Sequence, residues 1–430
     1  MYPLSTRCTA AGPRPWILAV GLWTAAAVPA CEPGEPGETA GAAREATVPA
    51  APPGPVRRLA DQPPSWKGGA RLELIREVRG AAVVGTEAAD STRPVFAAIR
   101  DVSADADGRI LVLDGDEARV TVLDRRGRVR GRLGRRGPGP GELRTPDRVE
   151  PSSSGGVLVF ERRPAAVHRW DSTGHHRGTT GLATSDSGSA AITGLADWGG
   201  AVAGARAVRL IGLRASDPSA STSAVHVADA SGRIDDPVVS WSTPGTRSRL
   251  PEVFGARRSW AAGDGPDGSG RIFVARGDRY EIRSYDTAGA LRTVLRRDVE
   301  PVPVSDELRE RALDRFVEEA GRAGAPPAMT RELRDRLPVA ESLPPIAGLW
   351  HSAPDGRLWV GIPGPGAGGE RPMVVRAWDV YEADGRFVGR VDAPRGFQLH
   401  RVRGGRLYGS WRDSLDVPGV RVYRLVEPSG

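Results

Sequence analysis

Four oxygen-bearing side chains early in the folded region have a spacing that could bind calcium. The segment SADADGRILVLD places Ser103, Asp105, Asp107 and Asp114 around Gly108. Calcium takes oxygen ligands from a short loop that turns at a glycine, and this spacing matches an EF-hand-type loop. However, an aspartate stands at the last position, where a bidentate glutamate is usual, and strands rather than helices flank the segment. A plain hairpin turn is the alternative, and the sequence favours it.

The histidines and cysteines show no metal-binding spacing. The chain has six histidines and two cysteines, with no His-x-x-x-His pair. His175 and His176 are adjacent, so on a strand they face opposite sides. We expect solvated loop histidines and no cofactor, with zinc or calcium held between distant segments as the alternative.

Nucleophilic catalysis has no signature in this chain. There is no Gly-x-Ser-x-Gly, no Ser-x-x-Lys and no reactive cysteine. The close carboxylate pairs Asp114/Asp116 and Asp235/Asp236 are better explained as turn residues than as a general acid and base. The sequence therefore favours a binding protein over an enzyme.

A glycine-rich stretch, GRLGRRGPGPGEL at 131–143, could be mistaken for a phosphate loop. A phosphate loop needs consecutive backbone N–H groups, and Pro138 and Pro140 have none. No Gly-Lys-Ser/Thr follows, and no amphipathic helix begins after it. We interpret the stretch as a structural crossover between two sheets.

The elements around these residues are short strands in a repeating unit. Apolar runs at 110–113 and 120–123 and an alternating run at 129–133 predict an antiparallel meander. Turns of the form Asp-x-x-Gly recur, and so does the strand start, as DGRILVLD, GSGRIFVAR and DGRLWVGI. The four regular turns are Asp124–Gly127, Asp171–Gly174, Asp229–Gly232 and Asp286–Gly289, with a variant copy at Asp384-Gly385.

This repetition predicts an all-β fold, a six-bladed β-propeller of four-stranded antiparallel blades over 70–430. No Asp-x-x-Gly turn follows the fifth one, so the last blade lacks an outer strand. The segment RLELIREV, Arg71 to Val78, is predicted to supply it by pairing with Val420 to Val426, which would close the ring. Seven blades remain the alternative, because 190–260 is difficult to divide into strands.

The crossover and the strands before it resemble the bacterial six-bladed β-propellers related to NHL repeats. In that family a strand pair with Leu-Asp at its ends leads to Gly-x-x-Gly-x-Gly-Pro-Gly-Glu-Leu/Phe, here Gly134 to Leu143. The resemblance covers roughly 70–430, and only the first blade matches closely. It implies the fold, whereas lyases and lactonases of similar architecture supply the alternative function: a metal-dependent lyase or hydrolase.

One segment departs from the repeat and predicts a small helical insertion at about 305–337. In SDELRERALDRFVEEAGRAG, Ser305 to Gly324, apolar residues recur at helical spacing and two acids occupy the first turn. Thr330 to Leu337 predicts a second short helix. The insertion is interpreted as a cap on the propeller, or as an element that binds a partner.

The charge of the chain does not indicate nucleic-acid binding. The formal net charge is +7 over 430 residues, but Lys67 is the only lysine and asparagine is absent. The arginines are scattered over strand ends rather than gathered on one element. We therefore expect no nucleic-acid partner.

The N-terminus predicts export and lipid anchoring. Residues 1–30 have a basic start and a short apolar run, as in a signal peptide. The run ends in Val28-Pro29-Ala30-Cys31, which resembles a lipobox, so Cys31 is the predicted lipidation site, with ordinary secretory cleavage as the alternative. Glu32 follows the cysteine, which favours the outer membrane or the periplasmic face of the envelope.

Residues 31–69 are rich in Pro, Gly and Ala and predict a flexible tether. A rigid ring on such a tether is typical of a recognition module. The sequence therefore favours a membrane-tethered, extracytoplasmic binding or scaffolding propeller. Its expected partners are the membrane, through the lipid, and a peptide, a glycan or an envelope protein.

Overall fold

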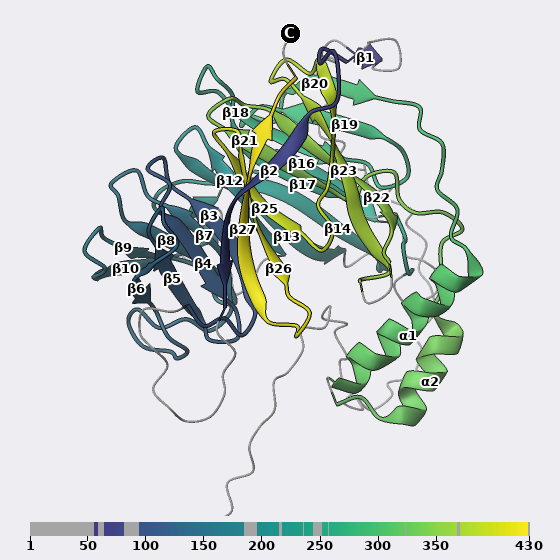
Figure 1. Ribbon diagram of the computed structural model, residues 1–430, viewed down its shortest axis with the longest axis horizontal. Helices are drawn as coiled ribbons and strands as arrows, with labels where there is room; N and C mark the ends of the chain where they lie inside the picture. The colour runs from purple at the N-terminus through teal and green to yellow at the C-terminus, as the bar shows by residue number, and fades with distance from the viewer. Residues whose placement is uncertain are drawn as a thin grey trace, which may run out of the picture.

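The computed structural model describes residues 56–58, 64–80, 94–184, 196–214, 217–234, 236–243, 252–256, 258–322, 324–367 and 370–428. The predicted signal peptide, Cys31 and most of the predicted tether lie outside these residues. The described part consists of short antiparallel ladders and two helices (Figure 1).

The first two sheets are regular four-stranded meanders in which each strand pairs with the next. The first contains β3 (Ile99–Ala104), β4 (Ile110–Asp114), β5 (Arg119–Leu123) and β6 (Val129–Leu133). The second contains β7 (Pro146–Pro151), β8 (Val157–Arg162), β9 (Ala165–Trp170) and β10 (His176–Gly181). Strand β4 is buried along its whole length and β6 is half-exposed, as expected for an inner and an outer strand.

The third sheet is the irregular one, in the region that the sequence left hard to divide. Its order is β11-β15-β14-β13-β12, and β16 also pairs with β14. Its strands are β12 (Asp197–Val202), β13 (Ala205–Arg214), β14 (Asp217–Ala228), β15 (Arg233–Ile234), β11 (Ala183–Thr184) and β16 (Val239–Thr243). The long β13–β14 hairpin is continuous in register from Arg206↔Ala228 to Leu213↔Ser221.

The fourth sheet gains a strand from the segment predicted as tether. It contains β17 (Ser259–Asp264), β18 (Gly270–Ala275), β19 (Glu281–Tyr285), β20 (Leu291–Arg296) and β1 (Val56–Arg58). Strand β1 runs parallel to β20. Nearby in sequence, Trp66 is buried against Trp378 and Val388, and its backbone N–H donates to the Val388 carbonyl at 3.0 Å. Ordered contacts therefore begin before the expected boundary at residue 70.

The last sheet has eight strands and closes the molecule. Its order is β2-β27-β26-β25-β21-β22-β23-β24. The strands are β21 (Gly348–Ala353), β22 (Leu358–Pro365), β23 (Met373–Tyr381), β24 (Phe387–Asp392), β25 (Gln398–Arg403), β26 (Arg406–Arg412), β27 (Pro418–Val426) and β2 (Arg71–Arg79). Only two parallel pairs, Ser352↔Val402 and Ala353↔Arg403, join β21 to β25.

The predicted closure between the two ends of the folded region is confirmed. Strand β2 pairs antiparallel with β27, from Arg71↔Val426 to Val78↔Val420 (Figure 1). Two ion pairs support the register: Arg421 with Glu77 at 2.8 Å, and Arg424 with Glu73 at 2.6 Å.

The ladders are arranged like the blades of a propeller. Their first strands lie side by side in a closed order: β3, β7, β12, β17, β21, β25 and again β3. The apolar core consists of layers between successive ladders, for example Leu113 of β4 against Val159 of β8. Hydrogen bonding nevertheless divides the described strands into five sheets, so the six separate blades expected from the repeat are not what the sheets show.

The Asp-x-x-Gly turns form as predicted, and the aspartate organises each one. The Asp124 carboxylate accepts the backbone N–H groups of Arg126 at 2.8 Å and Arg128 at 3.0 Å. Gly127 has φ +82°, a left-handed conformation that glycine adopts without strain. The crossover at 131–143 also has a structural role, because Leu143 is fully buried and Glu142 accepts the N–H of Gly139 at 2.9 Å.

The helical insertion lies between β20 and β21 and contains α1 (Asp306–Arg322) and α2 (Pro327–Arg336). The hydroxyl of Ser305 accepts the N–H of Leu308 at 3.2 Å and caps α1. Leu308, Ala312, Leu313 and Ala320 form its buried face. Both helices lie to one side of the sheets in Figure 1. Arg311 connects α1 to the β22–β23 hairpin by donating to the Gly366 carbonyl at 2.8 Å.

Candidate functional site

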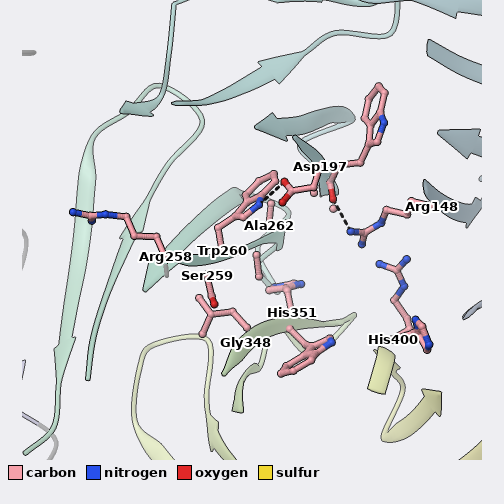
Figure 2. Close-up of a pocket in the computed structure, with 16 residues that line it drawn as sticks. Arg148, Asp197, Arg258, Ser259, Trp260, Ala262, Gly348, His351 and His400 are labelled. Carbon is pink, nitrogen blue, oxygen red and sulfur yellow. Dashed lines mark hydrogen bonds between the residues drawn. The ribbon is translucent and has the colours of Figure 1, made fainter. Parts of the chain in front are cut away.

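The candidate site is a pocket of about 370 Å³ between the innermost strands. Five strands line it: β7, β12, β17, β21 and β25. In β12, β17 and β21 the lining residues are the first ones of the strand, so the pocket lies near the end of the ring where these strands begin. Figure 2 shows side chains converging on it from several strands.

Two tryptophans form apolar walls of the pocket, and glycines make room for them. The indole N–H of Trp260 donates to the Asp197 carboxylate at 2.7 Å (Figure 2). A Cβ at Gly199 would lie 2.5 Å from Cη2 of Trp260, so only glycine permits this packing. Trp350 donates to the Leu399 carbonyl at 3.1 Å and lies against Gly348. Both indole N–H groups are therefore used within the protein, which fixes the rings.

An arginine–carboxylate network forms another wall. Arg148 of β7 donates from Nε to Glu150 at 3.0 Å and from Nη1 to the Trp198 carbonyl at 3.0 Å. Arg401 of β25 has Nη1 at 3.7 Å from Glu150 and Nη2 at 3.6 Å from Asp101. Behind them, Arg206 reaches Glu150 at 3.6 Å but does not line the pocket.

Burial and charge set the protonation of this network. Burial alone would raise the pKa of Asp101, but the neighbouring His400 and the Arg401 charge lower the pKa below its usual value. The pKa of Glu150 is lowered in the same way: Arg148 and Arg206 outweigh burial. Burial and the neighbouring Arg148 charge lower the pKa of Arg401. Both carboxylates are thus ionised and face three cationic arginines.

Two histidines line the pocket in different environments. His351 stacks on Phe273 with ring centroids 6.0 Å apart, and its Nε2 is buried without a hydrogen-bond partner. Burial lowers the pKa of His351 to about 4, so the ring is neutral at pH 7. His400 interacts through Nε2 with Ser410 at 2.9 Å, and its Nδ1 lies 3.6 Å from Asp101.

The expectation of solvated loop histidines is therefore wrong for five of the six, because His176 and His226 also lie on strands, β10 and β14, and are half-buried. His168, His351 and His400 lie on strands with buried ring atoms, and His168 bonds Glu161 at 2.9 Å. His175 is a turn residue, as expected, and bonds Thr173 at 2.8 Å.

The structure does not bring the four calcium candidates together. Asp105 pairs with Arg109 at 2.8 Å, and Asp107 lies in the turn beside it. Asp114 lies at the other end of β4, opposite Ile99, and its carboxylate accepts the N–H groups of Ala97 at 2.6 Å and Glu117 at 3.0 Å. Ser103 is buried within β3. The carboxylates of Asp105 and Asp114 serve turns, which agrees with the alternative interpretation of the segment.

Within the described residues, no group of three or more His, Cys, Asp or Glu side chains could hold a metal ion. The lipidation candidate Cys31 lies outside them. The pocket residues Arg148, Trp260, His351 and Arg401 were not singled out from sequence. Each of these residues lies on the first strand of its ladder. They are far apart in sequence and become neighbours only when the ladders close into a ring.

No protein-family model matches this chain. No curated protein matches it either. Similar solved structures include a member of the DUF4221 family from Bacteroides vulgatus, with a TM-score of 0.48 and 11% identity over 84% of this chain and 99% of that one. A gluconolactonase from Xanthomonas campestris has a TM-score of 0.40 and 14% identity over 84% of this chain and 98% of that one. A virginiamycin B lyase from Staphylococcus aureus has a TM-score of 0.39 and 11% identity over 83% of this chain and 100% of that one. All these TM-scores are below 0.5, so no conclusion rests on these likenesses.

Among the helices of the described residues, none combines the length and the apolar character that a membrane span requires.

Proposed function

We propose that this chain is a binding propeller that takes a ligand in the pocket between its innermost strands. The observation that carries the proposal is the convergence of two fixed tryptophans with arginines and histidines from four of the five lining strands on one cavity. Ligand sites are commonly concave, have apolar and aromatic walls, and carry a few placed polar groups. The expected ligand is a peptide, a glycan or a segment of an envelope protein.

We propose further that the protein works outside the cytoplasm, held at the cell envelope by a lipid on Cys31. The signal-like segment at 1–30 and the cysteine after Ala30 support this. Two acyl chains anchor a protein firmly, whereas one chain holds it only marginally. The tether after Cys31 would let the pocket reach ligands away from the membrane surface.

A ring of six blades is also part of the proposal. The eight-stranded sheet contains two antiparallel ladders, β21 to β24 and β25-β26-β27-β2, joined by only two parallel residue pairs. Counting these ladders separately gives one blade for each innermost strand. An experimental structure viewed along the channel would test the count.

The binding proposal is tested by probing the full chain with a glycan array and a peptide array, followed by calorimetry on the hits. Trp260→Ala should weaken binding at least ~10-fold, because a stacked aromatic contributes well over 1 kcal/mol. Trp411→Ala is the matched control: Trp411 packs under Arg421 and does not line the pocket. Hits whose affinity is unchanged by Trp260→Ala would contradict the proposal.

A further inference from the structure

We propose that the pocket binds the carboxylate of a small ligand, with Arg148 and Arg401 as the two cations that hold it. This inference rests on the proposed function and specifies the chemistry of its ligand. It depends on three observations: unpartnered nitrogen atoms, an excess of positive charge, and the size and walls of the cavity.

The first observation is that the Arg401 guanidinium is not satisfied within the protein. Its Nε and Nη2 atoms are buried and have no hydrogen-bond partner. The neighbouring carboxylates of Asp101 and Glu150 lie 3.6 and 3.7 Å away, too far for good hydrogen bonds. Buried polar groups without partners are rare and costly. Arg401 lines the pocket, so a cation whose charge is only partly compensated lies at the cavity wall and favours an anionic ligand.

The second observation is the balance of charge in the network. Three arginines, Arg148, Arg206 and Arg401, face two carboxylates, Asp101 and Glu150. Asp197 is a further carboxylate, on another wall of the pocket, and accepts the Trp260 indole N–H. Arg258 lies over Trp241 at 5.5 Å and points away from the other labelled residues in Figure 2. Among the five residues of this network, the arginines therefore outnumber the carboxylates by one.

A carboxylate fits this excess better than a phosphate does. It brings one negative charge, whereas a phosphate monoester brings ~2 at neutral pH. Its two oxygens match the planar fork of a guanidinium. Figure 2 shows Arg148 reaching toward the pocket from the side opposite Trp260. A ligand between them would place its carboxylate on the arginines and its body on the indole.

The third observation limits the size of the ligand. A cavity of about 370 Å³ is near the lower end of the usual range of ligand pockets, ~300–1,000 Å³. It holds one or two amino-acid residues or sugar rings. The neutral His351 adds no charge to the wall of the cavity.

The test compares matched acid and neutral probes by calorimetry on the full chain. One pair is galacturonate and galactose, and the other is an acetylated Phe-Ala dipeptide with a free carboxylate and its C-terminal amide. The acid should bind at least ~10-fold more tightly than its neutral partner in at least one pair, since a charge-assisted bidentate bond is worth more than 1.4 kcal/mol. Which pair responds identifies the source of the carboxylate, and either result supports the inference.

The variants assign the effect to the pocket. Arg148→Gln should lower the affinity for the acid at least ~10-fold and leave the neutral partner unaffected, and Arg148→Lys should restore part of it. Arg424→Gln is the matched control, because Arg424 pairs with Glu73 outside both the network and the pocket, and it should change affinity less than ~3-fold. Circular dichroism and thermal unfolding check the fold of each variant.

Equal binding of acid and neutral probes, or an acid affinity unchanged by Arg148→Gln, would overturn the inference. If neutral probes bind and depend on Trp260, the binding proposal survives and only the carboxylate assignment fails. If neither acid binds at millimolar concentration, the carboxylate assignment also fails, and the array experiment decides the proposed function separately.

Discussion

At the scale of single residues, the strongest buried charge lies outside the pocket, at Asp379. Its side chain is fully buried in β23 and accepts hydrogen bonds from Arg390 at 2.7 Å, Arg297 at 2.7 Å and the Tyr280 hydroxyl at 3.1 Å. Burial raises the pKa of Tyr280 well above its usual value, so the hydroxyl stays protonated and donates. Because Tyr280 directly precedes β19 and Arg297 directly follows β20, this carboxylate joins the fourth and the last sheets.

Asp379→Asn should therefore destabilise the protein. The substitution keeps the shape but leaves two arginines without their anion, and breaking a buried pair typically costs ~3–5 kcal/mol. The loss of unfolding free energy should be nearer ~3 kcal/mol, because both arginines are partly exposed and their guanidinium groups can be hydrated. Urea unfolding measures it. Asp384→Asn, at an exposed turn, is the control and should change the free energy of unfolding by less than ~0.5 kcal/mol; equal effects of the two would contradict this role of Asp379.

His351 predicts a dependence of stability on pH. Burial lowers its pKa to about 4 in the folded protein, despite the nearby Asp264 and Asp355, against ~6.5 in the unfolded chain. The unfolded state therefore binds the proton first, so stability is greatest above pH 6.5 and falls as the pH drops from 6.5 to 4. The difference amounts to ~3 kcal/mol.

Comparing wild type with His351→Gln isolates this contribution from that of the carboxylates. Between pH 7 and 4 the wild type should lose ~3 kcal/mol more than the variant in urea unfolding. His175→Gln, at a hydrogen-bonded turn, should behave like the wild type. Parallel pH profiles for wild type and His351→Gln would show that the ring is not buried as described.

What the sequence predicts at this scale depends on whether a residue acts locally. Asp124 and Gly127 are predictable because a turn needs its own aspartate and a left-handed glycine. Asp105 and Asp114 look like ligands of one ion in sequence, yet a five-residue strand separates them. Arg148 and Arg401 carry no local signal, since their significance arises only when β7 and β25 meet across the pocket.

At the scale of elements, the spacing of apolar residues and the repeated unit predicted both helices and the closing strand pair. They failed for a strand that is too short to show alternation and that does not belong to the repeat. The expected helix at Ser305–Gly324 is α1 at Asp306–Arg322, and Thr330–Leu337 corresponds to α2 at Pro327–Arg336. The strand β1 was missed, because three residues in a Pro-rich segment show no alternation. Its pairing partner β20 lies far away in sequence.

Removing the closing strand should destabilise the whole ring. A chain that starts at residue 82 lacks β2, exposes an edge of β27 and loses the buried Val78. We expect a loss of at least ~4 kcal/mol or failure to fold. A chain that starts at residue 64, which keeps β2 and Trp66, is the control. Val78→Ala tests the same contact in an intact chain, with an expected cost of ~2 kcal/mol; full thermal stability of the chain starting at 82 would contradict the closure.

At the scale of the whole molecule, the fold is held by contacts between ladders rather than by one central core. Each buried cluster spans two neighbouring ladders, as Phe160 of β8 and Trp198 of β12 show at 4.8 Å between ring centroids. The ring could be predicted because every ladder must bury both faces, and a closed circle of ladders achieves this. The number of hydrogen-bonded sheets could not be predicted from the sequence. It depends on whether β21 and β25, in neighbouring ladders, lie close enough to form hydrogen bonds.

A specifically bound metal would stabilise the whole ring, so thermal unfolding tests the metal-dependent alternative. We expect zinc, calcium and chelator each to shift the melting temperature by less than ~1 °C, because ligand binding stabilises only when a site exists in the folded state. Asp105 is used by Arg109 and Asp114 by backbone amides. A calcium-dependent rise that Asp105→Asn abolishes would revive the calcium loop, and a zinc-dependent rise with lactone hydrolysis would favour the lyase or hydrolase function.

The location of the molecule depends on one atom, the thiol of Cys31. If it carries lipid, labelling cells with an alkyne palmitate analogue should mark the protein, and the protein should sediment with membranes. Cys31→Ala should lose both the label and the sedimentation, since the substitution removes the thiol that would carry the acyl chains. Cys8→Ala is the matched control: Cys8 lies in the segment predicted to be removed, so its loss should change neither readout. Label that survives Cys31→Ala, or an unmodified cysteine in mass spectra of the mature N-terminus, would show that Cys31 is not the lipidation site.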